Sequence, residues 1–101
     1  MNFPKVTPQD IEDNIKHVEY VTHVSVSGKV LRWAVITVHN GFAVTGDPSA
    51  SVSVENDNEK TGQEVALRNA KSKLWQFMGY ELSEKLFNTK ARNEHPLLGE
   101  Q

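Results

Sequence analysis

The chain has 101 residues, a formal net charge of −2 at pH 7 and no cysteine, which predicts one domain with a modest core and excludes disulfides and thiolate metal sites. Its 24% charged and 38% hydrophobic residues are typical of a folded cytosolic protein, and no apolar run approaches the ~18–20 residues of a membrane span. The acidic balance disfavours non-specific binding of nucleic acid, which needs a basic surface.

The first predicted element is a helix that starts after Thr7. The side chain of Thr7 can accept a hydrogen bond from the first turn, and Asp10 stands where the acid of a capping box is found. Ile11, Ile15 and Val18 then recur at helical spacing. We therefore expect a helix of about ten residues with one apolar stripe.

Two strands of an antiparallel meander are predicted next. From residue 20 the sequence is rich in β-branched residues, and after a turn at residues 27–29 a long second strand covers residues 30–39. The two faces of this strand are Leu31, Trp33 and Val35 on one side and Val30, Arg32, Ala34, Ile36 and Val38 on the other. Because both faces carry apolar residues, we expect helices to cover one face and a second subunit to cover the other. This pattern predicts a homodimer or a higher closed homo-oligomer.

A tight hairpin is predicted at Asn40-Gly41, which lies between two β-rich runs. Both residues tolerate the positive φ angles of a two-residue type I′ turn. This turn would place Phe42 opposite His39 and Val44 opposite Thr37, and would start the third strand of the meander.

A long helix over residues 60–78 is predicted to follow a surface loop over residues 47–60, within which residues 51–54 alternate like a short edge strand. Its expected core stripe is Val65, Ala66, Ala70, Leu74, Phe77 and Met78, with Gly62 and the two alanines allowing close approach to the sheet. Gly79 is expected to end this helix, and residues 82–87 to form a short third helix. The predicted fold is therefore a single α+β domain over residues 5–87, with an N-terminal helix, a three-stranded antiparallel meander and a long C-terminal helix packed on the sheet. Residues 88–101 lack periodicity and are predicted to be a flexible tail.

Residues 5–87 contain three distinctive stretches, VTPQDIEDNI, TVHNGFAVTG and TGQEVALRNAKSKLWQFMGYELSEKL. Together these stretches resemble a family of short tailed-phage proteins known by the gene-product numbers 49 and 66. The resemblance implies a phage-encoded protein with no assigned chemistry. Two segments depart from the family pattern, at residues 47–49 and at the polar residues 56–58. The layout is also similar to that of phage anti-Thoeris sponges, which hold a cyclic ADP-ribose-type immune signal without cleaving it.

No catalytic, metal or cofactor site is predicted. The four histidines are His17, His23, His39 and His95, and none has the spacing of a zinc-binding motif. The chain also has no nucleophile elbow and no phosphate-binding glycine loop, and its carboxylates do not form an evident acid–base pair. We therefore expect a protein that binds rather than an enzyme.

The candidate ligand-binding residues are cationic or aromatic: Arg32, Phe42, Arg68, Lys71 and Trp75. A pyrophosphate joined to a base requires a guanidinium group and a stacking ring, and a dimer interface could bring such groups together. The same residues also fit ordinary core and surface roles. The leading hypothesis is a non-enzymatic phage protein that acts in the cytoplasm of the infected host by capturing a nucleotide-derived immune signal between subunits. The alternative is an interaction module that binds a host or phage protein through its exposed sheet face, with no small-molecule ligand.

Overall fold

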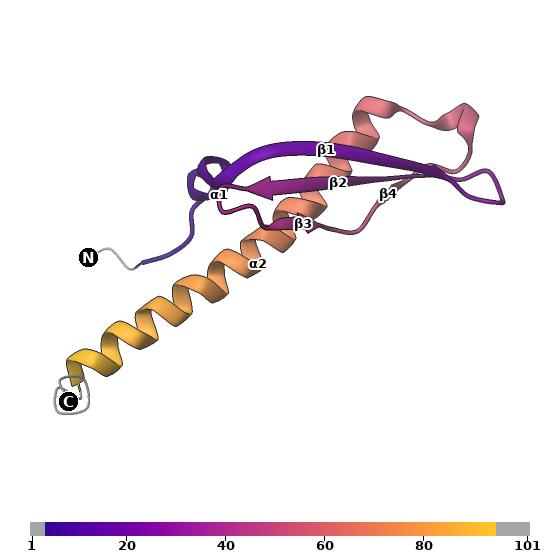
Figure 1. Ribbon diagram of the computed structural model, residues 1–101. Coiled ribbons are helices and arrows are strands. Elements are labelled where there is room, and N and C mark those ends of the chain that lie inside the picture. The colour runs from indigo at the N-terminus through magenta and orange to yellow at the C-terminus, as the bar shows by residue number, and fades with distance from the viewer. Residues whose placement is uncertain (1–3, 95–101) are drawn as a thin grey trace.

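The computed structural model of the chain describes residues 4–94 and has the α+β architecture that the sequence predicts (Figure 1). In chain order the elements are α1 (Pro8–Asn14), β1 (Ile15–Val24), β2 (Val30–Val38), β3 (Ala43–Thr45), β4 (Ser49–Ala50), the 3-10 helix η1 (Val54–Asn56) and α2 (Glu59–Glu94). A sheet and one long helix that crosses it therefore make up most of the fold.

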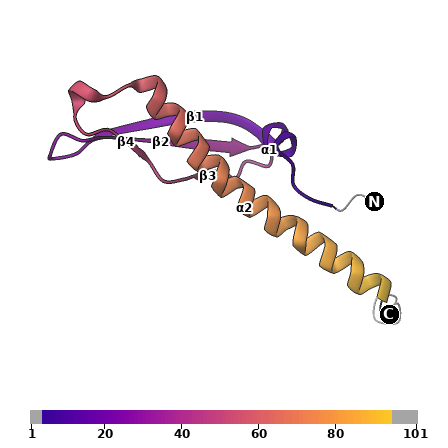
Figure 2. The same cartoon turned by 180° about the vertical axis from the view of Figure 1, so that it is seen from behind.

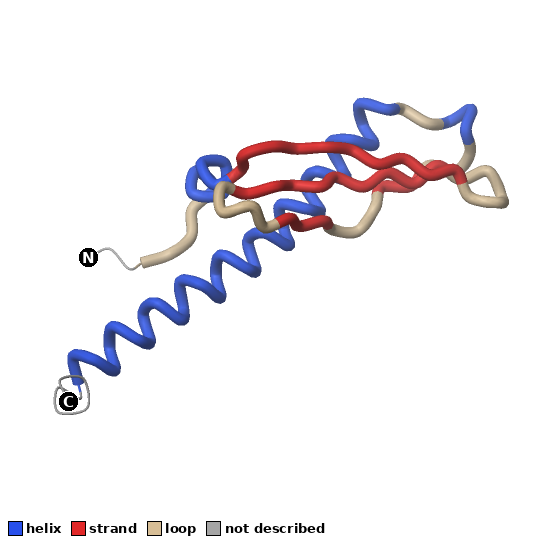
Figure 3. Tube along the Cα trace, in the orientation of Figure 1, coloured by secondary structure: helices blue, strands red, loops and turns tan. Residues whose placement is uncertain are grey.

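Strand β2 is the centre of the sheet (Figure 3). Strand β1 pairs with it antiparallel along one side, while β3 and β4 pair with successive parts of its other side. The sheet thus has four strands rather than the three predicted, because the chain returns to β2 at Ser49–Ala50. The edge strand expected at residues 51–54 is therefore placed slightly too late.

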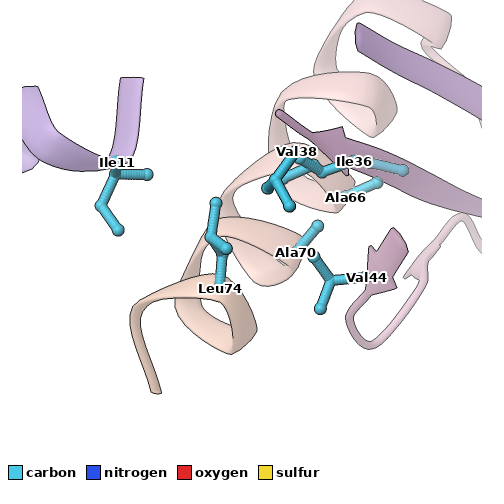
Figure 4. Close-up of a cluster of buried hydrophobic side chains, with 8 residues drawn as sticks. Ile11, Ile36, Val38, Val44, Ala66, Ala70 and Leu74 are labelled. Atoms are coloured by element: carbon cyan, nitrogen blue, oxygen red, sulfur yellow. The ribbon is translucent and has the colours of Figure 1, made fainter. Parts of the chain in front are cut away.

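Helix α2 covers one face of the sheet, as the two opposite views show (Figures 1 and 2). The core lies between this helix and the alternate residues of β2 that face it (Figure 4). Its buried residues are Ile11, Ala34, Ile36, Val38, Val44, Ala66, Ala70 and Leu74. Two alanines at the sheet-facing side of α2 let the helix approach closely, as the sequence predicts. A side chain on Gly46 would collide with the α2 backbone at Asn69 and Ala70.

Helix α2 extends well beyond the sheet and gives the molecule its elongated shape (Figure 1). Its 36 residues correspond to a length of about 54 Å, and the whole molecule measures 65 × 29 × 20 Å. The radius of gyration of 19.0 Å exceeds the roughly 13 Å of a compact domain of this size. The sequence prediction that Gly79 ends the helix is wrong, since α2 continues through this residue to Glu94. The predicted third helix is thus part of α2, as is the start of the predicted tail, and residues 95–101 lie outside the described residues.

The N-terminal helix is shorter than the periodicity predicts. Thr7 and Asp10 form the predicted capping box, with reciprocal hydrogen bonds of 3.1 and 2.9 Å. Helix α1 nevertheless ends at Asn14, and Ile15 begins β1 instead of a further helical turn. The β-branched Ile15 and Val18 fit a strand as well as a helical stripe, and their pairing with β2 decides between the two.

The hairpin between β2 and β3 has a three-residue loop rather than the predicted two-residue type I′ turn. Only Gly41 has a positive φ there, at 92°, and its N–H donates to the carbonyl of Val38. The pairing therefore shifts by one residue and places Val44 opposite Ile36 instead of Thr37. Because a shift of one residue exchanges the faces of a strand, Val44 points towards α2 and is buried.

Candidate functional site

Three of the predicted ligand-binding residues line one groove on α2. Arg68, Lys71 and Trp75 are three and four residues apart, so they share a face of the helix. The groove has a volume of about 520 Å³. Its lining residues, which define the α2 groove from here on, are Glu64, Leu67, Arg68, Lys71, Ser72 and Trp75.

The α2 groove lies on the flank of α2 that faces α1 and β1. Lys71 donates from Nζ to Oε2 of Glu12 in α1, over 2.5 Å. Asn69 reaches in the other direction, where its side-chain amide donates to the carbonyl of Asp47 after β3, over 3.0 Å. Positions 69 and 71 are about 200° apart around a helix. The flank of α2 that carries Lys71 therefore faces α1, and the opposite flank, which carries Asn69, faces the segment after β3.

The α2 groove combines positive charge with an aromatic surface. The side chain of Arg68 is exposed and makes no ion pair or hydrogen bond with the side chains described for residues 4–90. Trp75 is 40% exposed. A guanidinium group can bind a phosphate with two parallel hydrogen bonds, and an indole ring can stack on a base. All the lining residues come from one helix, so the groove is open on the side away from α2.

Arg32, also predicted as a ligand-binding residue, lies in a different place. It is 5% exposed, and its guanidinium donates to both carboxylate oxygens of Asp57, over 3.1 and 2.9 Å. Its Nε donates to the hydroxyl of Thr22. This bidentate pair raises the pKa of Arg32 and holds the pKa of Asp57 below its ordinary value. The pair fixes the segment before α2 against the sheet.

A glycine accommodates the buried arginine. A side chain on Gly62, in the first turns of α2, would collide with the guanidinium of Arg32. The close contact predicted at Gly62 is therefore between α2 and the Arg32–Asp57 pair. Arg32 lies beneath the helix, away from the outward-facing α2 groove.

Phe42 also lies apart from the α2 groove. It follows the hairpin loop, is 52% exposed and meets Phe77 of α2 edge to face, with the ring centroids 5.5 Å apart. Phe77 and Trp75 are two positions apart and so point to different sides of the helix. The structure therefore brings together three of the five predicted residues and leaves Arg32 and Phe42 elsewhere.

The second face of the sheet carries no covering element within the described residues. Leu31, Trp33 and Val35 of β2 are half-buried there. Val21 of β1, opposite Trp33 in the register, is 51% exposed. We call these four residues the open face. The structure thus confirms that α2 covers only one of the two apolar faces of β2.

Sequence reasoning missed several residues of these sites. Glu64, Leu67 and Ser72 also line the α2 groove. Glu64 and Ser72 are four residues from Arg68, and Leu67 is four residues before Lys71, so helical spacing could have identified them. Asp57, the partner of Arg32, lies in a polar segment without periodicity, so no sequence signal assigns it. Glu12 reaches Lys71 only through the tertiary fold.

The described part of the chain contains no cluster of metal-binding side chains and no membrane-spanning helix. Among the side chains that the structure describes, those of residues 4–90, no three of His, Asp or Glu lie close enough to hold a metal ion. His95 lies outside these residues. Neither α1 nor α2, over the residues described, has a stretch hydrophobic enough to span a lipid bilayer.

Comparison with known proteins gives one finding. The model of the phage protein (N4 Gp49/phage Sf6 gene 66) family matches residues 6–86, which include both the sheet and the α2 groove. Neither a curated protein nor a solved structure matches the chain.

Proposed function

The chain belongs to the phage protein (N4 Gp49/phage Sf6 gene 66) family, and from this premise we propose that it acts by stoichiometric binding, without catalysis, in the cytoplasm of the infected host. Its proposed ligand is a nucleotide-derived immune signal of the cyclic ADP-ribose type. Sequestration of this signal would counter a host defence that depends on it.

The α2 groove carries this proposal, because it places Arg68, Lys71 and Trp75 side by side. The two cations would bind the pyrophosphate of such a signal, and the indole ring would stack on its base. Lys71 is held in place by Glu12, while Arg68 has no ion-pair partner among the described side chains. The volume of about 520 Å³ is within the range of roughly 300–1,000 Å³ for small-molecule sites.

A second copy of the chain would complete the site. Small-molecule sites surround most of their ligand, and a groove lined by one helix contacts a ligand from one side only. We therefore include in the proposal that two copies assemble, so that the signal is held between them. This assembly matches the homo-oligomer that the two apolar sheet faces predict.

Thermal unfolding of the protein with cyclic ADP-ribose tests the proposal. A ligand that binds only the folded state raises the melting temperature by mass action, and we expect a rise of several degrees at micromolar ligand. Arg68→Ala and Trp75→Ala should each abolish most of this rise. Lys73→Ala is the matched control, because Lys73 is an exposed cation of the same helix outside the groove.

The result that would contradict the nucleotide proposal is an unchanged melting temperature of the wild-type protein at ligand concentrations up to the millimolar range. An equal loss in Arg68→Ala and Lys73→Ala would also count against it, since it would show a general effect of charge rather than a site.

The open face supports a second candidate function, the binding of a host or phage protein without a small-molecule ligand. Trp33 and its neighbours form an apolar strip with no covering element in residues 4–94, and tryptophan is enriched among the residues that dominate protein interfaces. Under this alternative the protein would ignore nucleotides and bind a discrete protein partner. Trp33→Ser should then abolish binding of that partner, whereas Arg68→Ala should not.

A further inference from the structure

The outer edge of β1 has no hydrogen-bonding strand beside it in the described structure. Over its ten residues, β1 pairs only with β2, and the other side of the strand faces away from the sheet (Figure 3). Long exposed edges of this kind template pairing with another chain, and proteins that avoid such pairing use proline, lysine or bulges to block it.

The features that could block pairing at the outer edge of β1 lie at one end of the strand. The register irregularity lies between Ile15 and His17, at the only lysine of the strand, Lys16. From His17 to Val24 the pairing with β2 is regular, with no proline and no bulge. The outer edge is therefore available over this regular part.

Two backbone hydrogen bonds of β2 show which residues of β1 direct their N–H and C=O groups away from the sheet. The N–H of Ser51 donates to the carbonyl of Val30, and the N–H of Val38 donates to the carbonyl of Phe42. The even-numbered residues of β2 thus bond towards β3 and β4, so the residues opposite them in β1 do not bond to β2. Those residues, which define the β1 edge, are Val18, Tyr20, Thr22 and Val24.

We propose that the β1 edge pairs antiparallel with the β1 edge of a second copy, about a two-fold axis at Val21. In this register Val18 lies opposite the partner's Val24, and Tyr20 opposite the partner's Thr22. These are the residues whose N–H and C=O groups point outwards, so they form the ladder. The two copies then share one continuous sheet.

Side-chain complementarity selects this register, because a carboxylate can accept a hydrogen bond from an imidazole N–H. Glu19 lies opposite the partner's His23, and the symmetry repeats the pair on the other side of the axis. An axis at Glu19 would place two carboxylates opposite each other, and an axis at Tyr20 would place His17 opposite the partner's His23. Among these three axes, that at Val21 alone pairs the acid with a histidine, and it puts two apolar side chains at the centre.

The pairing also fits the location of the α2 groove. A two-fold axis perpendicular to the sheet keeps both α2 helices on the same face, and the α2 groove lies on the β1 flank of its helix. The two grooves would therefore lie on the same face of the joined sheet. This last consequence rests on the proposed function, whereas the pairing itself does not depend on any ligand.

Cysteine crosslinking tests the pairing directly, because the chain has no cysteine of its own. Residues at the axis that face each other without exchanging hydrogen bonds have Cα atoms about 4.5 Å apart, within the range for a disulfide. We expect Val21→Cys to form a crosslinked dimer rapidly under mild oxidation. Val26→Cys is the matched control, since Val26 is fully exposed in the turn after β1. Crosslinking of Val21→Cys no faster than that of Val26→Cys would overturn the proposal.

Charge exchange tests the register in the full chain by sedimentation equilibrium. His23→Glu places a carboxylate opposite the partner's Glu19 twice, and should raise the dimer Kd about tenfold. Adding Glu19→Lys to this variant places opposite charges across the interface and should return the Kd to near the wild-type value. Circular dichroism checks that each variant is folded.

Two results would overturn the proposal: a wild-type chain that stays monomeric at high concentration, or a dimer whose Kd the double variant does not restore. Neither result depends on the melting experiment with cyclic ADP-ribose. The edge pairing and the nucleotide function can therefore fail separately.

Discussion

The two faces of β2 have similar composition but different surroundings. On the covered face Ala34 and Ile36 are 1% and 0% exposed under α2. On the open face Trp33 and Val35 are only half-buried, with no element over them in residues 4–94. The difference shows that an apolar strand face requires a cover but does not specify which element provides it. Over the part of the chain that the structure describes, the fold covers one face itself and leaves the other face and the β1 edge without a covering element.

The largest expected effect is a difference in the free energy of unfolding between truncations on the two faces of β2. Ile36→Ala leaves a cavity in the core and should lower the free energy of unfolding by about 2–5 kcal/mol. Val35→Ala, one position along the same strand on the open face, should lower it by about 1 kcal/mol or less. Urea denaturation of the two variants measures both values. Equal losses would show that the open face is covered after all.

A glycine pair tests how closely α2 packs on the sheet. Gly46→Ala would force apart the loop after β3 and the backbone of α2 at Asn69, and should cost about 1–3 kcal/mol. Gly79→Ala is the matched change: the space around Gly79 is open, and α2 is continuous there, so alanine should stabilise the protein by about 1 kcal/mol. Stabilisation by both changes would contradict the close contact.

The buried Arg32–Asp57 pair predicts a pH dependence of stability. Because the hydrogen bonds from Arg32 hold the pKa of Asp57 below its ordinary 3.8, the carboxylate stabilises the fold fully above that value. This contribution is lost as the pH falls below 3.8 through the lowered pKa. Asp57→Asn should be less stable at neutral pH and should lose less stability on acidification.

Free energies of unfolding from neutral pH down to about pH 3, on either side of the ordinary carboxyl pKa, measure this difference. Glu55→Gln is the control, since Glu55 is an exposed acid two residues away. If wild type and Asp57→Asn lose stability in parallel as the pH falls, the Arg32–Asp57 pair is not the source of the pH dependence.

The smallest expected effect on stability is on the open face. Val21→Ala removes two methyl groups that face Trp33 across the two strands, and should lower the free energy of unfolding by about 0.5–1 kcal/mol. Unfolding at two protein concentrations measures it. A larger loss that grows with protein concentration would show that a second copy covers this face.

The sequence predicts the elements of this fold better than their ends. The capping box at Thr7 and the alternation along β2 are local signals, and both are correct. The end of α1 depends on the pairing of Ile15 with β2, which is a long-range contact. The rule that a glycine ends a helix fails at Gly79, because a helix tolerates one glycine when the neighbouring residues favour the helix.

In the candidate site, too, the positions that depend on local spacing differ from those that depend on long-range contacts. Arg68, Lys71 and Trp75 lie together because they follow one another at helical spacing, which is a local property of the sequence. Arg32 and Phe42 come from the sheet, and their positions depend on how α2 crosses it. The pairing of Arg32 with Asp57 joins residues 25 positions apart, so it could not be predicted from either residue.

Titration calorimetry of the wild-type protein with cyclic ADP-ribose tests the central claim most directly, namely that the protein binds a nucleotide-derived signal and does not transform it. We expect saturable binding, recovery of the unchanged ligand after the protein is denatured, and loss of binding in Arg68→Ala but not in Lys73→Ala. The absence of binding at millimolar ligand, or recovery of a cleaved product, would contradict the account.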